Sequence, residues 1–129
     1  MSRHTEQSDP LQFSVCRPRQ DVTLLMVGGE IDLATAPRLR AELTRVGGGR
    51  TATLVLDLSP VTFLAAAGLT VLVEAQAEAV RSDCRVLVIT KERNVDRVLR
   101  ITGLSTGFHL VGSVDAALAE SAAGYGETA

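Results

Sequence analysis

Apolar positions follow a period of two over short stretches of the chain. Leu11 to Cys16 alternates apolar with polar residues, and Val22 to Val27 is an apolar run that ends at Gly28-Gly29. The turn between them spans only residues 17–21, so the two segments predict an antiparallel hairpin. Three further strands are predicted at Thr53 to Leu58, Arg85 to Thr90 and Phe108 to Val111.

Between the later strands the apolar period lengthens to that of a helix. A first helix has Leu39, Leu43 and Val46 on one face, with Thr35 as its expected N-cap and Gly47-Gly48-Gly49 as its stop. The longest helix is predicted over Ala66 to Ser82. Its predicted inner face consists of Leu69, Leu72, Val73, Gln76, Ala77 and Val80.

Two shorter helices complete the pattern. One begins at Asn94 as its cap, runs through Ile101 and stops at Gly103, and a last one begins after Ser113 as its cap. Pro60 to Leu64 is interpreted as a connecting loop. The predicted order is therefore β-β-α-β-α-β-α-β-α.

This order predicts an α/β fold. Helices between strands imply right-handed crossovers and parallel pairing, whereas the first strand should lie antiparallel at an edge. The expected architecture is a mixed, mostly parallel sheet with helices packed on it. Residues 11–120 form one domain, and the polar or small residues of 1–10 and 121–129 are expected to be flexible tails.

Composition narrows the function. Hydrophobic residues make up 46% of the 129 residues and aromatic residues only 3%, which predicts one domain with an aliphatic core. The net charge of -2 offers no broad basic surface, so nucleic-acid binding is not expected. Neither a membrane span nor a signal peptide is visible, which predicts a cytoplasmic protein without membrane contact.

Residues that carry chemistry are sparse. His4 and His109 stand alone, and the Gly47-Gly48-Gly49 run lacks the Lys-Ser of a phosphate loop. Asp57 is expected to point toward a strand end or to bond a loop. No nucleophile stands near a base, so we predict a non-enzymatic chain with no cofactor, metal or small-molecule substrate. Cys16 and Cys84 are interpreted as reduced small apolar residues, with a regulatory disulfide as the alternative.

Three stretches, in their order and spacing, resemble a known family. Gly29-Glu30-Ile31-Asp32, followed by Thr35-Ala36, resembles the G-E-[IL]-D-x-x-T-A segment of bacterial anti-sigma factor antagonists. Leu54 to Leu58 and then Val61 to Leu64 resemble their central strand and loop. Gly103-Leu104 resembles their S-G-L turn. The sequence thus resembles the STAS domain family.

The resemblance implies a STAS fold over nearly all of residues 11–120 and a partner-switching function in sigma-factor-dependent transcription. Members typically bind an anti-sigma factor that is also a serine kinase. The kinase phosphorylates a Ser in a D-S-[ST]-G motif at the start of the second helix, and the antagonist then dissociates. The implied partner-binding residues are Asp32, Thr35, Thr62, Phe63, Ala65, Ala66, Ala67 and Gly68.

The sequence departs from the family at the phosphorylation motif. Ala65 replaces the Asp, Ala66 replaces the acceptor Ser, and Ala67 replaces the following Ser or Thr. The chain is therefore predicted to remain in the unphosphorylated, binding-competent form. Two alternatives stay open: modification of Thr62 or Thr70 instead, and a different role as a scaffold or sensor subunit of a larger signalling assembly.

Overall fold

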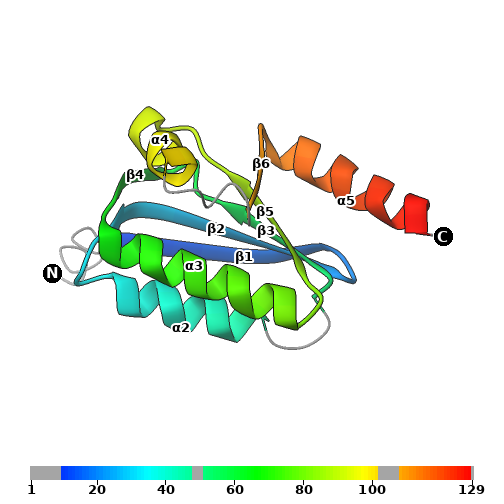
Figure 1. The fold of residues 1–129 in the computed structure, drawn as a ribbon, viewed down its shortest axis with the longest axis horizontal. Helices are drawn as coiled ribbons and strands as arrows, with labels where there is room; N and C mark the ends of the chain where they lie inside the picture. The colour runs from blue at the N-terminus through cyan, green and yellow to red at the C-terminus, as the bar shows by residue number, and fades with distance from the viewer. Residues whose placement is uncertain (1–9, 48–50, 102–107, 129) are drawn as a thin grey trace, which may run out of the picture.

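The computed structural model describes residues 10–47, 51–101 and 108–128, and places them in one sheet flanked by helices (Figure 1). The N-terminal residues 1–9 and the glycines Gly48, Gly49, Gly103 lie outside the described residues. In chain order the elements are β1 (Leu11–Arg19), β2 (Val22–Ile31), α2 (Ala36–Gly47), β3 (Thr53–Asp57), β4 (Val61–Leu64), α3 (Ala66–Arg81), β5 (Arg85–Ile89), α4 (Arg93–Ile101), β6 (His109–Val111) and α5 (Val114–Thr128).

The sheet confirms the predicted α/β class. Its strands follow the order β1-β2-β3-β5-β6, with β4 paired to β2 off this path. β1 is the antiparallel edge strand of the hairpin, and all other pairings are parallel. Arg17, Pro18 and Arg19, predicted as a turn, belong to β1. Charged residues and a proline there discourage a further strand from adding to this edge.

Alternation along the central strands builds two cores. Leu25 of β2 and its partner Leu56 of β3 face α2 and α3, whereas Leu24 and its partner Val55 face α5. In Figure 1, α2 and α3 lie side by side along one face of the sheet. Because both faces of the sheet are covered, β3 is buried at every position, as its apolar run predicts.

The prediction of a loop over residues 60–64 is wrong. Val61–Leu64 is β4, which pairs in parallel with the last residues of β2. β2 itself runs through Gly28 and Gly29 instead of ending there. Gly29 has φ +107°, and a Cβ on it would lie 1.9 Å from the Pro10 carbonyl oxygen. The glycine pair thus permits a close approach within a strand, although local patterning indicates a stop there.

The predicted inner face of the longest helix is also partly wrong. Leu72 is buried, but Val73 and Val80 are 42% and 65% exposed. The buried positions of α3 are Gly68, Val71, Leu72 and Ala79. Apolar residues occupy both sides of this helix, so the sequence period leaves its rotation ambiguous. The contact of Gly68 with Ile31 selects the rotation, since a Cβ on Gly68 would lie 2.2 Å from Ile31 Cγ2.

The N-cap prediction differs from the structure at α4 and holds at α5. The Oε1 of Glu92, and not the Asn94 side chain, accepts from the first N–H groups of α4. Ser113 caps α5 as predicted, through the N–H of Ala116. Residues 121–128, expected to be part of a flexible tail, belong to the alanine-rich α5, which continues through Thr128.

Replacing Gly68 by alanine is expected to destabilise the fold. The added methyl collides with the buried Ile31 and Leu64 side chains, and such overpacking costs about 1–3 kcal/mol. Urea unfolding measures the change. Gly47→Ala is the matched control, because a Cβ there meets nothing within 4 Å and should leave stability equal or higher. Equal stability of the two variants would contradict the close packing.

Candidate functional site

The turn between β2 and α2 is held by Asp32 and Thr35. The Thr35 hydroxyl accepts from the Asp32 N–H at 2.8 Å and donates to the Glu30 carbonyl at 2.9 Å. The Asp32 carboxylate accepts from the Thr35 N–H at 3.0 Å, and this bond lowers the pKa of Asp32 below its ordinary value of 3.8. Contrary to the prediction of an N-cap, the Thr35 hydroxyl therefore closes the turn and does not cap the first free N–H groups of α2.

Leu33 lies at the exposed tip of this turn, and sequence reasoning missed it. Its side chain is 80% exposed, the highest value among the large apolar residues that the structure describes. The bonds between Asp32 and Thr35 hold the backbone on both sides of it. The sequence shows only a leucine between Asp32 and Thr35, and its exposure follows from the side-chain bonds of the turn, which the structure reveals.

The start of α3 lies beside this turn. The Ala65 N–H donates to the Ile31 carbonyl at 2.8 Å, which continues the β2–β4 ladder into the helix. Ala65 is the N-cap and forms no side-chain cap, and the first turn contains no acidic residue. Ala66 is exposed, Ala67 is half-buried and Gly68 is buried. The N-terminus of α3 is thus uncharged and uncapped, and the methyl group of Ala66 lies at the surface there.

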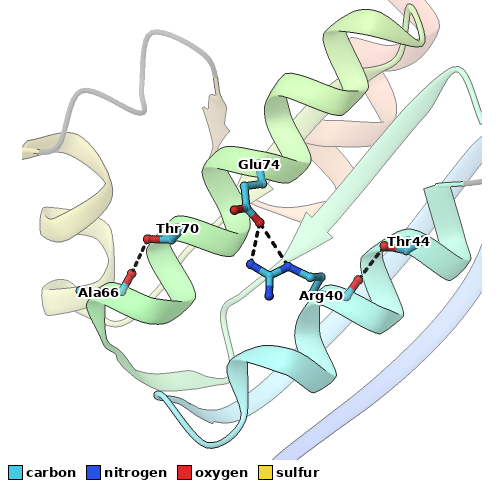
Figure 2. Close-up of polar contacts among 5 residues, drawn as sticks. All are labelled: Arg40, Thr44, Ala66, Thr70 and Glu74. Carbon is cyan, nitrogen blue, oxygen red and sulfur yellow. Dashed lines mark hydrogen bonds and ion pairs between the residues drawn. The ribbon is translucent and has the colours of Figure 1, made fainter.

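Figure 2 shows two polar contacts of α3 beyond its first residue. One turn after Ala66, the hydroxyl of Thr70 donates to the Ala66 carbonyl, which is the local bond expected for a helical threonine. A further turn on, Glu74 binds the guanidinium of Arg40 on α2, with Nη2 at 2.7 Å from Oε1. This ion pair is exposed and contributes little stability, but it links the two helices that begin at the site.

Thr62 and Phe63 come from β4. Phe63 pairs with Glu30 in the parallel ladder, and the residue is 52% exposed. The Thr62 hydroxyl donates to the Gly29 carbonyl at 3.3 Å, so this exposed threonine is tied to β2. We call the exposed residues Leu33, Thr62, Phe63 and Ala66 the docking patch. Of the predicted residues, Asp32, Thr35, Ala65 and Gly68 build its framework.

Other residues that the sequence analysis considered for chemistry are Asp57 and the two cysteines. Asp57 accepts from the Ser59 N–H and hydroxyl, the loop bond predicted for it. Cys16 and Cys84 are both free thiols; Cys16 is exposed, whereas burial raises the pKa of the half-buried Cys84 thiol. Across residues 10–47, 51–101 and 108–128, no three His, Cys, Asp or Glu side chains gather as metal ligands.

The fold and the patch together define a small α/β domain with an exposed, largely uncharged surface where two helices begin. Its described helices include none long and apolar enough to cross a bilayer. Comparison with known proteins then identifies the family. The model of the STAS domain matches residues 15–117, and the chain belongs to this family.

Relatives in the family are named as antagonists. The chain is 34% identical over 97 residues to an anti-sigma-F factor antagonist, RsfB, of Mycobacterium tuberculosis; the match covers 75% of this chain and 79% of that protein. The crystal structure of an anti-sigma factor antagonist from Mycobacterium paratuberculosis is 31% identical with a TM-score of 0.78, over 88% of this chain and 95% of that one. A structure from Thermotoga maritima, 22% identical with a TM-score of 0.76 over 84% and 92% of the two chains, shares the fold.

Restoring a side-chain cap at the start of α3 should stabilise the protein. Ala65→Asp places a carboxylate where the N-cap bond is missing, and such caps contribute about 0.5–2 kcal/mol. Urea unfolding at neutral pH measures the gain. Ala77→Asp, an exposed position further along α3, is the matched control and should give no gain. A gain that is the same in both variants would show that the uncapped N-terminus is not the cause.

The Asp32 carboxylate should make stability depend on pH. Because its pKa is lower in the folded protein than in the unfolded chain, its contribution is present above the unfolded value and is lost as pH falls through the folded value. Urea unfolding of wild type and Asp32→Asn should therefore differ at neutral pH. The two proteins should converge once the pH falls below the lowered pKa of Asp32 in the folded protein. An undiminished difference at acidic pH would contradict the role of the charge.

Proposed function

We propose that this chain is an anti-sigma factor antagonist that binds its partner through the docking patch. Membership of the STAS family supports this function, as do the names of relatives at 34% and 31% identity. The observation that carries it is the exposed Ala66 at the start of α3, which follows the exposed Phe63 of β4 in the chain and is tied through the Ala65 N–H to Ile31, two residues before the exposed Leu33. An apolar patch on a rigid frame is a typical protein-binding surface.

The proposed partner is an anti-sigma factor of the serine-kinase type. Such a partner meets no hydroxyl at residue 66, so the proposed complex is not dissociated by phosphorylation at that position. This pathway acts on transcription and would place the protein in the cytoplasm.

The position of residue 66 explains why a phosphate there would matter. The first N–H groups of α3 have no side-chain acceptor, and the helix dipole favours negative charge at this end. A phosphate would therefore be held firmly at the surface and would add a charge of about -1.5 to -2. That charge would have to lose its water against an apolar partner surface. The alanine methyl keeps the same surface neutral.

Binding assays on residue 66 test the proposal. Isothermal titration against each anti-sigma factor encoded in the source genome should yield a complex whose affinity does not change with ATP. Ala66→Glu should weaken that complex by about tenfold or more, because it buries an unpaired charge. Ala77→Glu, an exposed position further along α3, should leave the affinity near that of wild type.

Phosphate transfer separates the two parts of the proposal. With ATP, the wild-type chain should take up no phosphate, whereas Ala66→Ser should be phosphorylated and then dissociate. Failure of every anti-sigma factor to bind would refute the antagonist function. Stoichiometric phosphate on the wild-type chain would refute the unswitched state and would direct attention to Thr62 and Thr70.

A further inference from the structure

The outer surface of α4 carries a row of arginines. Arg93, Arg97 and Arg100 are spaced by four and then three residues, which places them on one helical face, and all three are exposed. Val95 and Leu99 are buried on the opposite face. The arginine side chains therefore point away from the core. We call these three residues the arginine face.

The acidic residues of the same segment are already bonded. Glu92 Oε1 accepts from the N–H groups of Asn94 and Val95 at the helix start. Asp96 accepts from Arg100 and from the Thr90 hydroxyl, and these bonds hold its pKa below the ordinary range. Both carboxylates keep their charge, but the three arginines outnumber them over residues 92–101, so this segment stays net positive.

Two of the arginines have no polar partner among the residues that the structure describes. Neither Arg93 nor Arg97 forms an ion pair or a side-chain hydrogen bond with any residue in the described part of the chain. This local positive charge contrasts with the net charge of -2 for the whole chain. A positive face on an otherwise slightly acidic protein attracts a negative surface selectively.

The helix that carries the arginine face lies next to the strand β4 of the docking patch. α4 packs against β4, the strand that contributes Thr62 and Phe63 to the patch. Figure 1 shows α4 beside β4, at the end of the molecule where α3 begins. A protein bound over the patch would therefore extend toward α4.

We propose that the arginine face is the electrostatic part of the docking surface and binds an acidic segment of the partner protein. The identity of that partner rests on the function proposed above. The face is too small for the other polyanions: α4 is about 13 Å long and its few charges neutralise few phosphates of a duplex. Anionic membranes are recognised by clusters of about four to eight basic residues.

Association kinetics test the face on the complex. Arg93→Glu with Arg97→Glu should slow association with the anti-sigma factor about tenfold at low ionic strength, and added salt should abolish the difference. Arg17→Glu with Arg81→Glu is the matched control. It changes the net charge equally at the hairpin and the C-terminal end of α3, opposite α4 in Figure 1, and should leave the rate near wild type.

Outcomes with the partner separate the two proposals. If no anti-sigma factor binds wild type, the proposed function fails. If one binds wild type and the α4 variant at the same rate across the salt range, the function holds and the arginine face is refuted.

A probe that needs no partner tests the face alone. A fluorescent octaglutamate peptide should bind wild type at low salt and lose most of its binding to the α4 double variant, but not to the control. A 20-base-pair duplex and phosphatidylserine vesicles serve as competing probes. Tighter binding of either one through Arg93 and Arg97, or equal peptide binding by both variants, would overturn the proposal. Circular dichroism confirms that each variant is folded.

Discussion

The structure depends on the parallel pairing of β4 with the end of β2. This pairing continues beyond the strand into the bond from the Ala65 N–H to the Ile31 carbonyl. Gly68 then rests directly on Ile31, at a distance that excludes any side chain. One short ladder and one glycine contact therefore fix where α3 begins, how it is rotated and how close it lies to the β2–α2 turn.

Rigidity at this point gives the docking patch its properties. The Asp32–Thr35 bonds hold the turn that exposes Leu33, and the pairing of β4 with β2 holds Phe63 opposite Glu30. An apolar side chain that is fixed before binding loses little conformational freedom when a partner covers it. The uncapped start of α3 is a local loss of stability at the same place, and such violations of local rules concentrate at functional sites.

Local patterning was sufficient for the elements whose pairing and burial follow from their own residues. The β1–β2 hairpin, the buried β3 and the Leu39–Leu43–Val46 face of α2 all follow the predicted pattern. It failed for β4, because four residues after Pro60 acquire strand geometry only from their pairing with β2. It failed for the rotation of α3, because Val73 and Val80 are as apolar as the residues that the Gly68 contact turns inward.

In the candidate site too, some residues could be predicted from the sequence and others could not. Ala65, Ala66, Ala67 and Gly68 were found through the resemblance to the STAS family, which the family match then confirmed. Leu33 was not found, since its exposure results from the side-chain bonds of the turn. The spacing of the arginines in α4 is visible in the sequence, but the net charge of -2 gives no sign of a positive surface. The structure shows that the three arginines share one exposed face of the helix.

The two surfaces proposed for binding would control different steps of association. Charges on the arginine face act at long range and set how often a partner arrives in the right orientation. The neutral docking patch acts on contact, and its desolvation sets how long the partner remains. Because residue 66 cannot carry a phosphate, neither step can be switched off on this chain at that position. In the proposed complex, unless Thr62 or Thr70 is modified, occupancy then depends on the concentrations of antagonist and anti-sigma factor.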